Sequence, residues 1–313
     1  MKRRDFLASS ALFGVAGLTG AAETAADITG KKPRTEQNQL CFNTACILHY
    51  DLPIEEELAI AAKAGFPAVE VWMTRVARYV EEGKSLAELK RRIDDLGLRV
   101  VNGIGFAEWI VNDDAQRAAG LATMRTEMER LAELGCPYIA APAAGPWKER
   151  IEGTERIAER FRAVLALGDA TGVRPMLELW GTSPTFSRLS DVVAAALATG
   201  RSDALLLLDA YHLFRGGNTF DSLALLNGQA MPLFHLNDWP DRPREELADK
   251  DRVFPGDGVA PLPELLRRLN AIGFRGPLSL EIFNPDYQSQ MTPEELARTG
   301  FKKMRDLIGR AEI

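Results

Sequence analysis

Residues 154–179 have the sequence TERIAERFRAVLALGDATGVRPMLEL, in which a helical pattern, a glycine and a short apolar run follow one another. Apolar residues in the first part recur every three or four positions, which is typical of one buried helix face. Gly172 stands where the helix pattern stops, a position that favours glycine, and the apolar run after it indicates a buried strand. The stretch therefore predicts a helix joined to a strand through one glycine.

The same helix, glycine and strand order recurs along the chain from residue 40 onward. We predict strands at 40–43, 68–72, 99–104, 138–141, 174–179, 204–208, 233–236 and 278–282. We predict the helices between and after them at 54–64, 85–96, 114–134, 154–171, 190–199, 221–226, 262–272 and 293–308. Eight such units fit a closed (β/α)₈ TIM barrel, a single α/β domain, better than an open doubly wound sheet. No glycine-rich nucleotide motif opens a helix.

Composition narrows the class of protein. The chain has 313 residues, 46% of them hydrophobic, and a net charge of −6. This acidic balance argues against nucleic acid as a partner, because such proteins carry a clustered basic face. The three cysteines form no CxxC pair, and we expect them to be small buried residues. The sequence is compatible with a monomer or a homo-oligomer.

The first residues follow the pattern of an export signal. The segment KRRDFL at residues 2–7 resembles a twin-arginine signal, and a Gly/Ala-rich apolar run continues to Ala22. The run is shorter than the roughly 20 residues of a spanning helix, so we expect no stable membrane anchor. We predict a signal peptide over residues 1–26, a flexible lead-in over 27–39 and the barrel over 40–313. This predicts a periplasmic protein.

Polar residues stand at the ends of four consecutive predicted strands, the fifth to the eighth. The ends of barrel strands carry the active site in such folds. An ionised carboxylate in an apolar run costs several kcal/mol unless it is paired or bound to a cation. One such acid alone would be explained by an arginine partner or by solvent, but a set of four favours one divalent ion, Mn²⁺, Mg²⁺, Co²⁺ or Zn²⁺. The four residues are Glu178, Asp209, His235 and Glu281.

These segments resemble the xylose-isomerase-like family of sugar isomerases and epimerases over about residues 40–308. Residues 209–212, DAYH, are similar to its Asp-x-x-His segment, and residues 251–258, DRVFPGDG, are similar to its Asp-Arg-Val-x-Pro-Gly-x-Gly run. The resemblance implies that the four strand-end residues bind one metal ion. It also implies that His212 and Arg252 contact the substrate.

The activity implied is isomerisation or epimerisation of a keto sugar or an inosose, a cyclitol ketone, by proton transfer through an enediolate. Glu178 and Glu281 come from non-adjacent strands, so one would remove a proton and the other would return one. If a leaving group lies β to the same carbon, the outcome is instead a lyase or dehydratase reaction on 3-keto sugars or inososes. Sugar binding without turnover is a further alternative. Cleavage of abasic DNA is disfavoured, since its multi-metal sites use more histidines than the three found here.

Further residues extend the predicted site. Tryptophans stand at or after the ends of the predicted strands two to five. Core packing would explain any one of them, but together they would form an apolar wall against a sugar ring, with Trp109 and Trp180 as substrate contacts. Glu70 alternates with apolar residues in the second strand, which indicates that its side chain points into the barrel. The long segment 237–258 is predicted to be a functional lid. The four tryptophans are Trp72, Trp109, Trp147 and Trp180.

Overall fold

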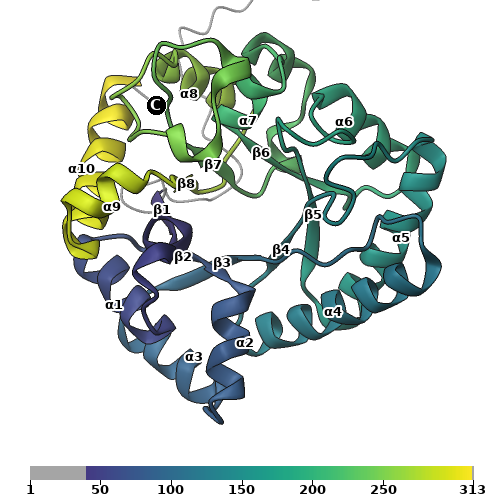
Figure 1. Ribbon diagram of the computed structural model, residues 1–313, viewed down its shortest axis with the longest axis horizontal. Coiled ribbons are helices and arrows are strands. Elements are labelled where there is room, and N and C mark those ends of the chain that lie inside the picture. The colour runs from purple at the N-terminus through teal and green to yellow at the C-terminus, as the bar shows by residue number, and fades with distance from the viewer. Residues whose placement is uncertain (1–39, 312–313) are drawn as a thin grey trace, which may run out of the picture. The chain divides into compact units, whose positions relative to one another are not determined.

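The computed structural model describes residues 40–311, and these form a closed barrel of eight parallel strands in sequence order, ringed by helices (Figure 1). β1 pairs with β8, with Leu40 opposite Leu278, and this pairing closes the ring. The predicted (β/α)₈ barrel is therefore confirmed. The predicted signal peptide and lead-in, residues 1–39, lie outside the described residues.

The strands lie where the apolar runs predicted them, with shifts of one or two residues at a few ends. They are β1 (Leu40–Asn43), β2 (Ala68–Trp72), β3 (Arg99–Ile104), β4 (Tyr138–Ala141), β5 (Arg174–Glu178), β6 (Leu205–Asp209), β7 (Phe234–Leu236) and β8 (Leu278–Leu280). Their side chains are almost all buried, because helices cover the outside and the interior is filled.

The helices include seven of the eight that were predicted. They are α1 (Ile54–Ala64), α2 (Met73–Glu81), α3 (Leu86–Asp95), α4 (Asp114–Glu133), α5 (Thr154–Thr171), α6 (Leu189–Ala198), α7 (Ala210–Arg215), α8 (Leu262–Ala271), α9 (Pro285–Gln290) and α10 (Pro293–Ala311). The eighth, expected at 221–226, is a 3₁₀ helix, η3 (Phe220–Leu225). Four more 3₁₀ helices are η2 (Thr44–Tyr50), η4 (Gly228–Ala230), η5 (Arg244–Glu246) and η6 (Asp249–Asp251). None of the helices in this part of the chain is long and apolar enough to cross a bilayer.

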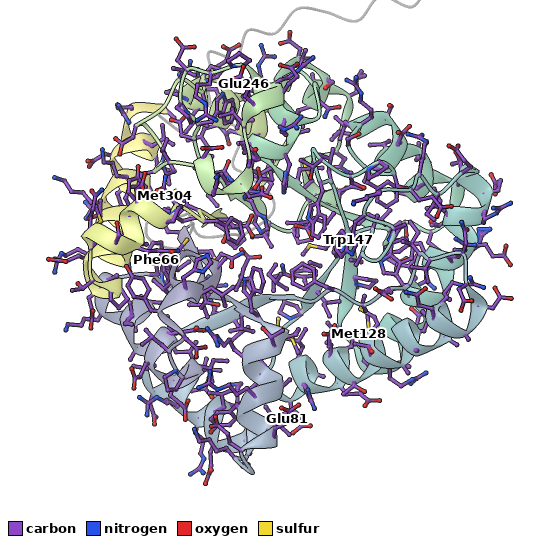
Figure 2. All side chains as sticks on the ribbon, viewed as in Figure 1. Phe66, Glu81, Met128, Trp147, Glu246 and Met304 are labelled. Carbon is purple, nitrogen blue, oxygen red and sulfur yellow. The ribbon has the colours of Figure 1, made fainter. Side chains whose placement is uncertain are left out.

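Glycines end helices as the sequence pattern predicted. Gly65 and Gly172 follow α1 and α5 with φ of 103° and 79°, the left-handed region that glycine adopts without a steric penalty. Just after Gly65, the Phe66 ring packs 5.1 Å from the rings of both Phe42 and Phe301, so that β1, the turn after α1 and α10 share one core. Figure 2 labels Phe66 and Met304 of α10 in this part of the barrel. The three cysteines are free and buried, as expected.

Candidate active site

Three of the four predicted metal ligands come together at one end of the barrel. Asp209 ends β6, His235 lies in β7 and Glu281 follows β8, and all three are buried. One ligand atom from each lies within 4.8 Å of the other two. His235 Nδ1 is 3.3 Å from Glu281 Oε2 and 3.8 Å from Asp209 Oδ2. We call these three residues the triad.

Glu178 ends β5 and lines the same cavity as Glu281, but it is not a member of the 4.8 Å group. It is buried, and among residues 40–311 its Oε2 has no hydrogen-bond partner. Burial raises the pKa of Glu178 to about 8, against the opposing influence of a positive charge on His235. The fourth predicted ligand is therefore a carboxyl group with an unpaired oxygen beside the triad.

Arg252, which was expected to contact substrate, lines the cavity and is bonded to the carboxylates of the site itself. Its Nη1 donates to Glu281 Oε2 (2.7 Å) and Asp209 Oδ2 (3.3 Å). Its Nη2 donates to Asp249 Oδ1 (2.5 Å) and to His212 Nε2 (2.9 Å). Burial opposes the charge of this side chain, but the three carboxylates outweigh it and raise the pKa of Arg252. Arg252 thus compensates part of the negative charge at the barrel mouth.

His212 presents a neutral imidazole to the cavity. Its Nε2 accepts from Arg252, so its proton is on Nδ1, and this buried atom has no partner in the described chain. Burial and the charge of Arg252 both lower the pKa of His212. Its backbone N–H donates to Asp209 Oδ1 (2.8 Å), which caps α7 and ties the position of His212 to the triad. His212 thus lies at the cavity with its Nε2 bonded to Arg252 and its Nδ1–H buried and unpaired.

The cavity next to the triad has a volume of about 510 Å³ and an aromatic wall. The Trp147 and Trp180 rings are stacked, with centroids 5.6 Å apart and planes at 13°, and Trp147 is 54% exposed. Figure 2, which views the barrel end-on, shows Trp147 near the centre of the ring of strands, whereas Glu81 and Glu246 lie at the rim. A flat apolar surface of this kind suits the face of a sugar ring. The aromatic residues that line the cavity are Trp72, Phe106, Trp147, Trp180 and Phe283.

Trp109 does not belong to this wall, and its predicted contact with substrate needs correction. It is fully buried, its Nε1 donates to Pro142 O (2.8 Å), and its ring packs against Phe161 of α5. A tryptophan that has already satisfied its N–H and filled a core position has no surface left for a ligand. Phe106, three residues earlier in the same loop, lines the cavity instead.

Four polar residues that line the cavity were not among the predicted site residues. They are His49, from the end of η2, Thr182, from the segment after β5, and Asp249 and Lys250, from η6. Asn237 Nδ2 donates to Asp209 Oδ2 of the triad (2.8 Å), and Asn237 was also not among the predicted site residues. Strand-end position does not select these residues. For Asp249 and Lys250, the one signal in the sequence was the unusual length of segment 237–258.

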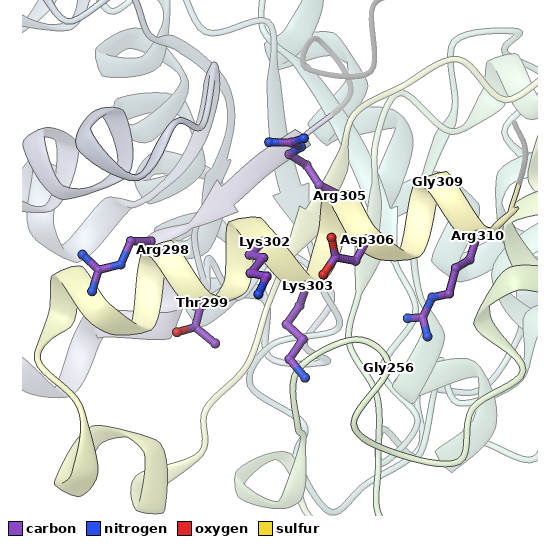
Figure 3. A pocket seen from close by; sticks show the side chains of 9 residues that line it. All are labelled: Gly256, Arg298, Thr299, Lys302, Lys303, Arg305, Asp306, Gly309 and Arg310. Carbon is purple, nitrogen blue, oxygen red and sulfur yellow. The ribbon is translucent and has the colours of Figure 1, made fainter.

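A second cavity, of about 920 Å³, lies along α10 and the loop at Gly256 (Figure 3). Its charged residues are mostly basic, with Asp306 as the one acid, and it contains no histidine. It offers neither a ligand set for a cation nor a buried unpaired group. We therefore place the candidate active site at the barrel mouth.

The donor set of the triad fits a divalent cation. His235 Nδ1 is buried, faces two carboxylates and has no hydrogen-bond partner in residues 40–311. Burial lowers the affinity of His235 for a proton, but Glu281 and Glu70 outweigh it and raise the pKa of His235 well above its usual range. The same carboxylates would favour a metal ion, and two carboxylates with one imidazole suit several divalent metals. Asp209, His235 and Glu281 would hold it.

Comparison with known proteins identifies the class: residues 58–307 match the model of the xylose isomerase-like TIM barrel family, and the chain belongs to this family. It is 29% identical to the inosose isomerase of Bacillus velezensis over 272 residues, which are 83% of this chain and 94% of that protein. It is also 27% identical over 248 residues to the 3-dehydroshikimate dehydratase of Pseudomonas aeruginosa, covering 76% of this chain and 37% of that protein.

Among solved structures, the fold matches the crystal structure of the IolI protein with a bound zinc atom, with a TM-score of 0.80. The two are 24% identical, and the match covers 87% of this chain and 98% of the other. At this identity the likeness supports the fold alone.

Proposed function

We propose that this protein is a divalent-metal-dependent isomerase or epimerase that acts on a keto sugar or an inosose. The observation that carries the proposal is the unpaired, buried Oε2 of Glu178 on the wall of a cavity that also exposes Glu281 of the triad. The family and the inosose isomerase relative support the substrate class. The zinc atom of the IolI structure supports a metal in this fold.

Glu178 and Glu281 would carry the protons. Glu178 accepts a proton on its free Oε2, since no other group competes for that atom within residues 40–311. Glu281 is held by Asn43 Nδ2 on Oε1 (2.9 Å) and by Arg252 Nη1 on Oε2 (2.7 Å). β5 and β8 are not neighbours in the barrel, so the two carboxyl groups approach a ligand from different sides. This arrangement allows removal of a proton on one side and its return on another.

The other residues orient the substrate and exclude water. The Nδ1–H of His212 would donate to a substrate oxygen, and the aromatic wall would cover one face of the ring. A divalent cation, when bound by the triad, polarises a carbonyl oxygen and so acidifies the neighbouring C–H group.

The test is solvent-proton exchange. The purified, metal-loaded protein is incubated in D₂O with 2-keto-myo-inositol and a set of ketohexoses, and deuterium at carbon is followed by NMR. We expect exchange and an isomer or epimer with one of them, and loss of both in Glu178→Gln and in Glu281→Gln. Glu149→Gln, a change at an exposed glutamate after β4, is the control and should stay active. Full exchange activity in both site variants would sink the proposal.

A second candidate is a lyase or dehydratase reaction on a 3-keto sugar or inosose, which the dehydratase relative favours. The same removal of a proton next to a ketone would then expel a β-hydroxyl or alkoxyl group. Ultraviolet absorbance of the enone product distinguishes this outcome from isomerisation, which forms none.

We also propose export by the twin-arginine route, on the basis of residues 2–7. Cell fractionation tests this proposal. The protein should be periplasmic, and the double change Arg3→Lys, Arg4→Lys should retain it in the cytoplasm. An unchanged distribution of the double variant would contradict it.

A further inference from the structure

Glu70 is a buried acid that the proposed chemistry does not use. It lies inside the barrel on β2 and is 0% exposed. Its carboxylate accepts hydrogen bonds from Asn102 Nδ2 (2.7 Å), from Asn43 Nδ2 (3.3 Å) and from Ser279 Oγ. Within the described residues, no lysine or arginine pairs with it. A buried carboxylate that accepts three hydrogen bonds from neutral side chains is held in one fixed orientation.

The strand register builds this arrangement. Glu70 is opposite Asn43 of β1 and opposite Asn102 of β3. The register between β2 and β3 shifts at Val69 and Glu70, so that Asn102 stands beside Glu70 and Val101 is passed over. Such irregularities re-aim side chains near functional sites. Here the shift replaces an apolar neighbour by a hydrogen-bond donor.

The fourth partner of Glu70 is His235 of the triad. His235 Nε2 lies 3.0 Å from Glu70 Oε2. Both oxygens of Glu70 accept hydrogen bonds, which is the pattern of an ionised carboxylate, so Nε2 must carry the proton. In a neutral imidazole this leaves a lone pair on Nδ1, the atom that faces Asp209 and Glu281.

We propose that Glu70 is a positioning residue that fixes the tautomer and the ring orientation of His235, so that Nδ1 is the atom that binds the divalent cation. Asn43, Asn102 and Ser279 hold Glu70 in place for this purpose. The inference deepens the proposed function, on whose metal site it rests. Carboxylate partners of a metal-bound histidine typically change metal affinity by about 10- to 100-fold when they are replaced.

The first test is metal affinity in the absence of substrate. Zn²⁺ binding to the full chain is measured by competition with a chromophoric chelator for the wild type and for Glu70→Gln. We expect Glu70→Gln to weaken binding by about 10- to 100-fold. Glu57→Gln is the matched control, because Glu57 is also a 0% exposed carboxylate but pairs with Arg75 on the outer side of the barrel. It should bind Zn²⁺ within about twofold of the wild type, since it does not touch a triad residue.

The second test reads the tautomer directly. In ¹⁵N NMR spectra of the Zn²⁺-loaded wild type, His235 should have a protonated Nε2 and a metal-bound Nδ1. If Glu70→Gln does not fold, Ser279→Ala removes one donor to Glu70 and should weaken Zn²⁺ binding by about 2- to 10-fold. Zinc on Nε2, unchanged affinity in the folded variants, or no Zn²⁺ binding by the wild type would each overturn the inference. Zn²⁺ binding with these effects but without turnover of any substrate would support it and contradict only the proposed function.

Discussion

Arg252 Nη1 lies 2.7 Å from Glu281 Oε2. Arg252 belongs to the long segment 237–258 after β7, and hydrogen bonds to Asp238 fix the conformation of this segment. The buried carboxylate of Asp238 accepts four backbone N–H groups, from Trp239, Gly256, Gly258 and Ala260, at 2.9 to 3.1 Å. Two parts of the segment also pair with each other through an antiparallel bridge between Asp238 and Val253. The Arg252 guanidinium at the triad is thus positioned by a segment whose backbone conformation is fixed.

The first prediction concerns the energetic role of this guanidinium. Arg252→Ala leaves Asp209, Asp249 and Glu281 without their buried cation, and breaking such a pair costs about 3–5 kcal/mol. We expect the free energy of unfolding in urea, measured with a chelator present, to fall by this amount. Arg201→Ala removes an arginine with two carboxylate partners at 2.7 Å on a more exposed site, and should cost several times less. Equal losses in the two variants would contradict the prediction.

The second prediction concerns metal removal. At a free Zn²⁺ concentration 100 times the Kd, binding to the folded state alone adds about 2.7 kcal/mol, which raises the Tm of a domain of this size by roughly 4–5 °C. Chelation should reverse the shift. Asp209→Asn should abolish the shift in a calorimetric scan, because asparagine still caps α7 but no longer offers a charged ligand. Asp203→Asn, outside the barrel mouth, should behave as the wild type. A full Zn²⁺ shift in Asp209→Asn would exclude Asp209 as a ligand.

The sequence predicted the barrel well because the signal is local and repeated. Apolar runs and glycine caps mark most strands and helices within two residues. The helices that were predicted wrongly, or not at all, depend on local features that apolar runs and glycine caps do not reveal. α7 starts directly after β6, because Asp209 is both the last residue of the strand and the cap of the helix, and no glycine separates the two elements. The η3 segment has helical composition but folds as a 3₁₀ helix, which an apolar pattern over six residues does not distinguish from an α-helix.

The site was only partly predictable, because strand-end position selects a residue but not its partners. Asp209, His235 and Glu281 meet as expected, since parallel strand ends meet at one face. The pairing of Glu70 with His235 joins side chains of β2 and β7, which are not neighbours in the barrel, so it leaves no trace in either strand alone. Likewise, Phe106 and Trp109 lie in one loop, and nothing local indicated that Phe106 faces the cavity and Trp109 the core.

The third prediction concerns the aromatic wall. Trp147 is 54% exposed and stacked on Trp180, so its removal should reduce contact with a bound ring and change little in the fold. An aromatic contact of about 0.5–1.5 kcal/mol corresponds to a KM raised about 2- to 10-fold in Trp147→Ala, with kcat nearly unchanged. Val259→Ala is the control, because Val259 is also 54% exposed but does not line the cavity. A fall in kcat with unchanged KM would mean that Trp147 acts on the reaction step and not on binding.

The fourth prediction concerns the pH dependence of stability through Glu127 of α4. Its carboxyl group packs against Gly105, which follows β3, and its Oε2 has no hydrogen-bond partner in residues 40–311. Burial raises the pKa of Glu127 to about 7, and the nearby charge of Arg130 lowers it only in part. The folded state therefore holds this proton more tightly than the unfolded state does. Its contribution to stability is complete below the unfolded pKa, about 4.3, and is lost as pH rises to about 7.

Glu127→Gln removes this titration. The variant should be more stable than the wild type at pH 8, by less than about 3 kcal/mol because the residue is partly exposed, and the difference should shrink toward pH 4. Urea unfolding at four or five pH values measures it. Glu129→Gln, an exposed position two residues further along α4, controls for the loss of one charge from the helix. A Glu127→Gln variant whose stability runs parallel to that of the wild type across this range would show that folding does not raise the pKa of Glu127.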